Sequence, residues 1–347
     1  MRTLTVVVIV ILTGFGAFFF LTDDIARFFF RPIESTLDNE ELSMAIAPEA
    51  IVEGLRVPWE VVVLPGGEFL VTERPGSLLR IGEDRQTIEI QGVADRGEGG
   101  LLGLALHPDF EENGWVYLYL TSAEGGALMN RVERYALEDS TLSERTVILE
   151  GIPGAANHDG GRIVFGPDGM LYVSTGDAGV PKRAQDTQNL AGKILRVTDE
   201  GAIPSDNPFG NAVYSYGHRN VQGLVWDEVG RLWATEHGRS GIRSGYDELN
   251  RIEKGANYGW PEVEGDETAE GIVAPEIHSG ASETWAPAGI AYAAGRVFFA
   301  GLRGETLYSA DVSGGGAHDL RAHLHPAVEA ARLDTYDFLA IHQKPID

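Results

Sequence analysis

Four short polar segments of the sequence carry side chains able to do acid–base and binding chemistry. They are Glu98-Gly99-Gly100, Asn157-His158-Asp159, Gly217-His218-Arg219-Asn220 and Thr284-Trp285-Ala286-Pro287. His158 is a candidate general base, because an imidazole titrates near neutral pH and either Asp159 or Asp177 could orient it. The alternative is a structural histidine that is hydrogen-bonded within a turn.

Arg219 is a candidate for binding an anionic or carbonyl group. Its planar guanidinium suits a carboxylate or a quinone oxygen. An arginine at this place could equally form a salt bridge with Asp177, so the residue types leave both interpretations open.

One loop of the sequence offers oxygen ligands for calcium. Asp247, Glu248 and Tyr258 supply the hard oxygen atoms that this ion requires. A solvated acidic turn is the alternative interpretation of the same residues.

A repeat positions the polar segments. Each copy has a glycine, a run of alternating apolar residues, a turn with Pro or Asp and Gly, and a second apolar run that often ends in Thr-Glu or Thr-Gly. Copies occur at residues 59–73, 103–119, 157–177, 223–236 and 289–300. A single copy cannot bury both of its faces, so copies of this size must stack as four-stranded blades. The pattern predicts an all-β fold, a β-propeller, whereas a β-sandwich gives no reason for one phrase to recur.

The phase of the repeat predicts where the polar segments meet. The first strand of every blade in a propeller lines the central axis, and each polar segment lies just before a first strand. We therefore expect the carboxylate, imidazole, guanidinium and amide of these segments to share one pocket at one end of the axis.

Composition excludes several classes of function. The chain has 347 residues with 52 acidic and 27 basic side chains, a net charge of −25, which repels nucleic acid and acidic lipid surfaces. It has no cysteine, so disulfides and thiolate metal sites are excluded and a metal must use oxygen or imidazole ligands.

The N-terminus predicts a membrane-anchor helix. Residues 4–21 are almost wholly apolar and would span about 27 Å as a helix. Arg2 precedes this segment and two aspartates follow it, which places the following domain on the outer side of the membrane. We expect an extracytoplasmic protein anchored to the cell membrane, with a cleaved signal peptide as the alternative.

The expected domain boundaries follow from these features. They are residues 1–22 as a signal anchor or signal peptide, 23–45 as a linker, 46–312 as the β-propeller and 313–347 as a divergent C-terminal tail.

The chain resembles the glucose/sorbosone dehydrogenase family, the soluble aldose sugar dehydrogenases that bind pyrroloquinoline quinone (PQQ) in a six-bladed β-propeller. The resemblance runs from about Val57 to Tyr308. The matching phrases are the segment around His158, Val71-Thr72-Glu73-Arg74-Pro75-Gly76, residues 99–110, residues 217–224 and Asn257-Tyr258-Gly259-Trp260-Pro261. Several long phrases in the same order make this a far more specific signal than one short motif.

The resemblance implies an oxidation of aldose sugars at the anomeric hydroxyl. His158 would take the hydroxyl proton while hydride passes to the quinone, and Asp177 would support His158. Arg219 and Asn220 would bind PQQ. An external acceptor would then receive the electrons.

The resemblance also implies calcium and further cofactor residues. One Ca²⁺ ion would be held by backbone oxygens around Gly238 and Arg239 and would polarise the quinone. Glu248 and Tyr258 match the positions of a second, structural calcium. Glu98 and Arg303 stand at cofactor-binding positions.

The chain departs from the pattern of the family at several places. Glu98 stands where a glutamine is common, Arg303 where a lysine is expected, and residues 237–247 replace a short His-Gly-Pro turn. After Tyr308 the sequence shows no further strand pair with a Pro-Asp-Gly turn. The sixth blade is therefore either degenerate, patched by the strand-like segment Ile46 to Leu55, or absent from this chain.

Two other functions compete with sugar oxidation. A non-catalytic propeller of the same superfamily would bind a carbohydrate or a protein. A calcium-dependent lactone hydrolase would use a metal-activated water in place of a quinone.

Overall fold

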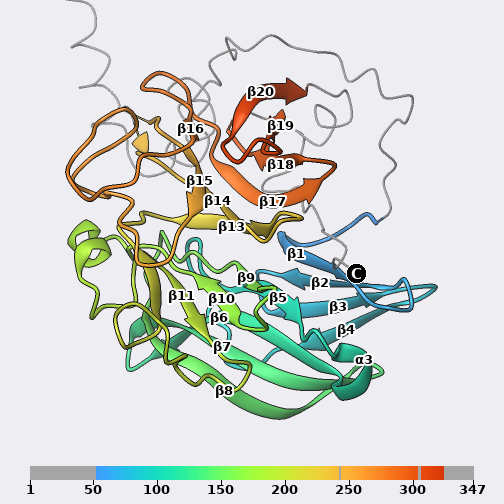
Figure 1. Ribbon diagram of the computed structural model, residues 1–347. Helices are drawn as coiled ribbons and strands as arrows, with labels where there is room; N and C mark the ends of the chain where they lie inside the picture. Colours follow the sequence, from blue (N-terminus) through green and yellow to red (C-terminus); the bar gives the residue numbers. More distant parts are fainter. Residues whose placement is uncertain (1–51, 242–243, 304–305, 324–347) are drawn as a thin grey trace, which may run out of the picture. The chain divides into compact units, whose positions relative to one another are not determined.

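The computed structural model describes residues 52–241, 244–303 and 306–323, and in them the chain forms five four-stranded sheets (Figure 1). All of these residues belong to the second of the two units into which the chain divides, Ser35–Asp347. The first two sheets contain β1 (Pro58–Val63), β2 (Phe69–Glu73), β3 (Ser77–Ile81) and β4 (Arg85–Glu89), then β5 (Leu101–Leu106), β6 (Trp115–Glu124), β7 (Ala127–Glu138) and β8 (Thr141–Pro153). The third contains β9 (Ile163–Phe165), β10 (Leu171–Ser174), β11 (Lys193–Val197) and β12 (Val213–Tyr216). The last two contain β13 (Val221–Trp226), β14 (Leu232–Glu236), β15 (Glu248–Ile252) and β16 (Ile277–His278), then β17 (Pro287–Ala293), β18 (Arg296–Gly301), β19 (Thr306–Asp311) and β20 (His318–His323).

Each sheet is an antiparallel meander whose strands follow one another in chain order. The first strands contact one another in sequence, from β1 to β5, β9, β13 and β17. This is the blade arrangement of a propeller, so the all-β propeller prediction is confirmed and a β-sandwich is excluded. Two short helices, α3 (Phe110–Asn113) and the 3₁₀ helix η1 (Pro181–Gln185), lie in connections between strands.

The number of blades differs from the prediction. We expected six, but the described part of the chain contains five. The expectation of a sixth blade came from the family resemblance, whereas the sequence itself holds five copies of the repeat.

The fifth blade extends beyond its expected end. Its fourth strand, β20, covers residues 318–323, although the propeller was expected to end at residue 312. Exposed and buried residues do not alternate along this outer strand: His318 and Asp319 are exposed, and only the last two residues are buried. Its sequence therefore lacks the period-two pattern that predicts a strand.

The segment before β1 covers one face of the first blade. Val52 and Leu55 pack against a cluster formed by Val71, Leu79 and Ile81. Residues 52–55 form no strand, so this part of the strand-like segment Ile46 to Leu55 contributes packing only. The expected anchor and linker, residues 1–45, lie outside the described residues. In the part that is described, no helix is long and apolar enough to cross a membrane.

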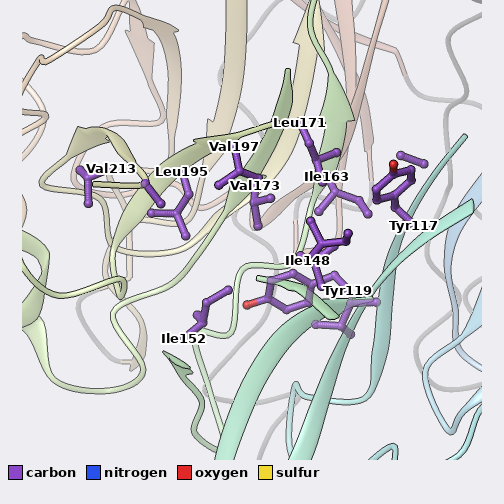
Figure 2. Packing of buried hydrophobic residues seen from close by; sticks show 14 of the residues in the cluster. Tyr117, Tyr119, Ile148, Ile152, Ile163, Leu171, Val173, Leu195, Val197 and Val213 are labelled. Atoms are coloured by element: carbon purple, nitrogen blue, oxygen red, sulfur yellow. The ribbon is translucent and has the colours of Figure 1, made fainter. Parts of the chain in front are cut away.

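Apolar side chains fill the space between neighbouring blades. Figure 2 shows the cluster between the second and third blades, where Tyr117 and Tyr119 of β6 meet Ile163 and Val173 of the third sheet. Both tyrosine side chains are fully buried. Burial of this apolar surface is what obliges each blade to stack on the next.

Hydroxyl groups fasten the first, third and fourth blades to the blades that follow them. Thr72 donates to the carbonyl of Leu102 at 2.6 Å, and Thr235 donates to the carbonyl of Ala288 at 2.8 Å. Ser174 makes the equivalent bond to the carbonyl of Val221 at 2.9 Å. A buried hydroxyl needs a partner, and Thr72, Ser174 and Thr235, near the ends of second strands, find one in the next blade.

A buried ion pair crosses the axis of the propeller. Arg162, just before β9, pairs with Glu60 of β1, and the two residues are only 8% and 7% exposed. Its Nε atom donates to the carbonyl of Gln222 in β13 at 3.0 Å, and its Cζ lies 4.2 Å from the ring centre of Trp59. A Cβ atom at Gly289 of β17 would come within 3.1 Å of the guanidinium, so a glycine suits this position.

We expect Arg162→Met to lower the free energy of unfolding by about 3–5 kcal/mol, because Glu60 would remain buried without a partner. The double variant Arg162→Met with Glu60→Met should lose less than the sum of the two single variants, since no charge is then left buried. Urea unfolding of the three variants measures this. Strict additivity of the two single effects would contradict the cross-axis pair.

Candidate functional site

His158 lies in the loop before β9 and is held in a left-handed backbone conformation, with φ of 61°. Its backbone N–H donates to Glu98 Oε2 at 2.7 Å, and its carbonyl accepts from the N–H of Ala178 at 3.2 Å. Its ring Nδ1 lies 2.7 Å from Asp177 Oδ1, while Nε2 has no hydrogen-bond partner among the described residues. A neutral imidazole that donates from Nδ1 to a carboxylate keeps Nε2 as a base, so the ring is arranged to accept a proton.

Asp177 is the residue that orients His158. Its side chain is fully buried; Oδ1 also accepts from the N–H of Gly179 at 2.8 Å, and Oδ2 accepts from the indole N–H of Trp260 at 2.9 Å. Burial alone would raise the pKa of Asp177. The hydrogen bond and charge of His158, together with the hydrogen bonds from Trp260 and Gly179, outweigh burial and lower that pKa from its ordinary value of 3.8. Asp177 is therefore ionised at neutral pH.

Asp159, the other candidate for orienting His158, faces elsewhere. Its Oδ1 accepts from Asn130 Nδ2 at 2.9 Å and from the N–H of Ala155 at 3.1 Å. Its Oδ2 is buried and has no partner in the part of the chain that the structure describes. Burial raises the pKa of Asp159 to about 6, against the lowering effect of these two hydrogen bonds.

Arg219 is held beside Trp260 rather than by a salt bridge with Asp177. Its guanidinium donates to Ser240 Oγ at 3.0 Å and to the carbonyl of His237 at 3.3 Å, and Cζ lies 5.4 Å from the ring centre of Trp260. Within the described ranges it forms no ion pair with Asp177; the contact between the two is the bond from the Asp177 N–H to the Arg219 carbonyl, 2.8 Å long. Burial lowers the pKa of Arg219, while the charges of Asp177 and Asp247 act to raise it.

Asn220 presents an unpaired donor. The residue is fully buried, and its Oδ1 accepts from the N–H of Gly160 at 3.0 Å. Its Nδ2 group has no acceptor in the described part of the molecule. Because a buried amide without an acceptor is costly, Asn220 and the neighbouring Arg219 fit a ligand rich in acceptor oxygens.

Glu98 and Arg303 occupy different parts of the same end of the propeller. Glu98 is exposed and joins the site through its bond to the His158 backbone. Arg303 is half-buried, and its N–H donates to the carbonyl of Trp285 at 3.1 Å. Burial lowers the pKa of Arg303 and the charge of Asp247 acts to raise it, so Arg303 belongs with the Asp247 loop rather than with His158.

The loop expected to hold calcium is closed on itself. The backbone groups of Arg239 and Gly245 exchange two hydrogen bonds of 2.8 and 3.2 Å, so the Arg239 carbonyl already has a partner. The Arg239 side chain contacts Glu264 at 3.0 Å. A Cβ atom at Gly238 would lie 2.2 Å from two carbonyl oxygens, those of Gly245 and Tyr246. Backbone oxygens therefore crowd around Gly238.

Asp247 organises this loop instead of offering free oxygens. Its Oδ1 accepts from the N–H of Gly238 at 2.9 Å. Its Oδ2 accepts from Thr284 Oγ1 at 2.7 Å and from the N–H groups of Trp285 and Ala286 at 2.6 and 3.0 Å. The carboxylate thus ties the start of β15 in the fourth blade to the polar segment before β17.

Glu248 and Tyr258 line a pocket together with Arg219, Glu236, Gly238 and Trp260. Glu248 lies directly opposite Glu236 on β14, and Asn250 Nδ2 reaches both, at 3.1 and 3.4 Å. Burial first, and the charge of Glu236 second, raise the pKa of Glu248 to about 8. A cation in this pocket would relieve that repulsion.

The hydroxyl of Tyr258 is not free to bind a metal. It donates to the carbonyl of Arg251 at 2.6 Å and accepts from the N–H of Glu253 at 2.8 Å. Only the backbone carbonyl of Tyr258 is left for a metal. No cluster of three or more histidines and carboxylates occurs in the described part of the chain, so a metal here would depend on backbone oxygens.

The structure thus brings together His158, Asp177, Glu98, Arg219 and Asn220, with Gly238, Glu248 and Tyr258 in the adjoining pocket. Sequence reasoning missed Trp260, which joins Asp177 to Arg219, and Gln185, which holds Trp260. Trp260 lies in the phrase Asn257-Tyr258-Gly259-Trp260-Pro261, which is one of the phrases that carry the family resemblance, so the sequence pointed to this region. No motif in the sequence marked Gln185 as a residue of the site.

Comparison with known proteins shows a family match. Residues 55–329 match the model of a family described as Glucose / Sorbosone dehydrogenase. Quinoprotein glucose dehydrogenase B from Acinetobacter calcoaceticus is 35% identical over 256 residues, which cover 62% of this chain and 52% of that protein. Aldose sugar dehydrogenase YliI from Escherichia coli is 35% identical over 232 residues, covering 61% of each. The matches thus span between about half and three fifths of these relatives.

A solved structure shows the same likeness. The PQQ-bound form of aldose sugar dehydrogenase from Streptomyces coelicolor has a TM-score of 0.76 and 42% identity, over 81% of this chain and 85% of that one.

The raised pKa of Asp159 predicts a pH-dependent stability difference. Folding favours protonated Asp159, so its contribution is fully present below pH 3.8 and is lost as the pH rises through about 6. A difference of about two pKa units at about 1.4 kcal/mol each makes Asp159→Asn more stable than wild type by up to about 3 kcal/mol at pH 7. Urea unfolding between pH 4 and 7 measures it.

Asp177→Asn provides a control of opposite sign. Because folding lowers the pKa of Asp177, its stabilising contribution is present above pH 3.8 and lost as the pH falls further. The Asp177→Asn variant should therefore be destabilised at pH 7. If the free energies of unfolding of wild type and Asp159→Asn changed with pH in parallel, the raised pKa of Asp159 would be contradicted.

Proposed function

Because the chain belongs to the glucose/sorbosone dehydrogenase family, we propose that it oxidises the anomeric hydroxyl of an aldose sugar to the lactone, with PQQ and Ca²⁺ as cofactors. The observation that carries this proposal is the placement of the His158–Asp177 pair, which is joined through Trp260 to Arg219, next to the unpaired Asn220 amide. A base and donors suited to oxygen atoms thus converge from the connections of the consecutive third and fourth blades.

The residues present fit an anionic quinone. Arg219 and the Nδ2 group of Asn220 would bind its oxygen atoms, and Arg303 would add positive charge at the same end of the propeller. When bound, PQQ supplies the electrophilic quinone that takes up the hydride. Carbonyl oxygens around Gly238 would hold a Ca²⁺ ion, and Glu248 with the carbonyl of Tyr258 would hold a second.

His158 supplies the proton chemistry of the proposed reaction. Nε2 takes the proton from the anomeric hydroxyl, and the C–H hydride leaves the same carbon, so the sugar loses two electrons and two hydrogens as the lactone forms. The ionised Asp177 stabilises the imidazolium that results and holds the ring in one orientation. The electrons leave through an external acceptor.

A non-catalytic propeller that binds a carbohydrate or a protein is the second candidate. The observation that favours it is the exposed Glu98 carboxylate, which bonds to the His158 backbone and brings negative charge to the place an anionic cofactor would approach.

The extracytoplasmic location and a membrane link through residues 4–21 stay predictions, since those residues lie outside the described part of the chain.

Titration with PQQ and Ca²⁺, followed by dye reduction with glucose and other aldoses, tests the first candidate. We expect turnover in the wild type and a fall in kcat of about 10²–10⁴-fold in His158→Ala, with PQQ affinity retained, because only the base is removed. Asn220→Ala should instead weaken PQQ binding. His318→Ala, an exposed histidine on β20, is the matched control and should behave as the wild type.

The other candidates give different results in the same assay. Absence of any quinone absorbance change over a wide PQQ titration would favour the binding propeller. Lactone hydrolysis that needs no PQQ but stops with a chelator would favour the calcium-dependent hydrolase.

Calcium binding at Glu248 predicts a stability effect that does not depend on PQQ. At one hundred times its Kd, Ca²⁺ should add about 2.7 kcal/mol to the free energy of unfolding, seen as a rise in Tm, and a chelator should reverse it. Glu248→Gln should lose most of this rise. Glu253→Gln, an exposed glutamate just beyond the same strand, should keep it, and an equal loss in both variants would count against the site.

A further inference from the structure

Trp260 connects the two halves of the candidate site. Its indole N–H donates to Asp177 Oδ2 at 2.9 Å, and its ring faces the guanidinium of Arg219, with 5.4 Å from Cζ to the ring centre. One side chain therefore contacts both the residue that orients His158 and a residue proposed to bind the cofactor.

The backbone of Trp260 is fixed on both sides. Its N–H donates to the carbonyl of Gly217 at 2.9 Å, and its carbonyl accepts from Gln185 Nε2 at 2.7 Å. The amide of Gln185 also exchanges two hydrogen bonds, 3.0 and 2.9 Å long, with that of Asn257. Gly217 has φ of 78°, and a Cβ atom there would lie 2.1 Å from Asn257 Oδ1, so the amide pair requires a glycine.

The helix that carries Gln185 is itself anchored. Lys193 of β11 is fully buried, and its Nζ donates to the carbonyls of Arg183, Ala184 and Ala191 at 2.8, 2.9 and 2.6 Å. These contacts fix η1 to the third sheet. Arg183 and Ala184 lie in the same short helix as Gln185, so the helix and the hydrogen bonds together connect the third sheet to Trp260, Asp177 and His158.

We propose that Trp260 is a positioning residue that holds the Asp177 carboxylate in the orientation in which it fixes the tautomer of His158. This inference rests on the proposed role of His158 as the base. Asp177 is fully buried, so no bulk water can replace a lost donor at Oδ2. With that donor gone, the carboxylate can turn away from Nδ1, and a neutral ring can place its proton on Nε2, where it no longer acts as a base.

The ring contact with Arg219 extends the same effect. A guanidinium over an indole face is attracted by the negative face of the ring, so Arg219 limits the movement of Trp260. The orientation of Asp177 and the placement of Arg219 are therefore coupled through one residue.

The test is Trp260→Phe in the full-length protein with ¹⁵N-labelled histidine. In the wild type without added cofactor, we expect Nδ1 of His158 to carry the proton and Nε2 to show the shift of an unprotonated nitrogen, with the signals assigned from His158→Gln. In Trp260→Phe the two ring nitrogens should move toward averaged shifts. In the reconstituted enzyme, kcat should fall about tenfold, because the hydrogen bond from Trp260 to the charged Asp177 is lost. The KM for sugar should change less than about twofold, because no contact with the sugar is removed.

Trp233→Phe is the matched control. The Trp233 indole N–H donates to the buried carboxylate of Asp227 at 3.0 Å, so the same substitution removes the same kind of bond in the fourth blade, outside the site. It should lose stability but leave the His158 tautomer and kcat unchanged. Gln185→Leu, which keeps the indole but removes the donor to the Trp260 carbonyl, should shift the tautomer in the same direction by less.

Two outcomes overturn the inference. One is a His158 tautomer that stays on Nδ1 in both Trp260→Phe and Gln185→Leu. The other is a fall in kcat in Trp260→Phe no larger than in Trp233→Phe. The tautomer is read without cofactor or turnover, so a wild type that oxidises no sugar would refute the proposed function while leaving the positioning role decided by the NMR signals.

Discussion

The buried ion pair between Arg162 and Glu60 is the constraint on which the arrangement of the site depends. Arg162 follows His158 by four residues, so a guanidinium fixed against β1 and β13 also fixes the loop that carries the candidate base. Two charges removed from water stabilise a fold only when their geometry and remaining hydrogen bonds are complete. Here the Arg162 guanidinium also donates to the carbonyl of Gln222 and lies over the ring of Trp59. These contacts restrict how the first, third and fourth blades can pack together.

Around that pair, hydrogen bonds join the connections of neighbouring blades. Glu98 before β5 accepts from the backbone of His158 before β9, and the backbone of Asp177 donates to Arg219 before β13. His237, after β14, reaches the carbonyl of Pro287 at the start of β17, 2.8 Å from its Nε2. The site is therefore not a set of side chains that project into empty space. It is a series of contacts between consecutive blades. A change in the spacing of two blades would therefore also displace the contacts that the next two blades make.

The sequence predicted the parts of this arrangement that depend on periodicity. The repeat predicted blades, and its phase predicted that the segments of His158 and Arg219 would meet, because both depend only on where first strands begin. It did not distinguish Asp177 from Asp159 as the partner of His158, since both are close in sequence and the choice depends on side-chain direction. It did not predict that the Asp247 carboxylate is occupied by four donors, or that Trp260 joins Asp177 to Arg219. These contacts join residues up to 83 positions apart and leave no local pattern. The sixth blade was expected from family resemblance alone.

The contrast between the two aspartates shows what sets the chemistry of the site. Asp159 and Asp177 are both buried and both belong to the segment around His158, yet burial raises the pKa of Asp159 to about 6 while the pKa of Asp177 is lowered. The difference lies in their hydrogen bonds. Both oxygens of Asp177 have donors, the imidazole and Gly179 at Oδ1 and the indole at Oδ2, whereas Oδ2 of Asp159 has none among the described residues. Donors to the charged form, rather than burial, therefore decide which of the two carboxylates has the lower pKa. Burial acts to raise the pKa of Asp177, and the imidazole is the first of the donors that lower it, so the hydrogen bond that orients His158 also favours the charged form of its partner.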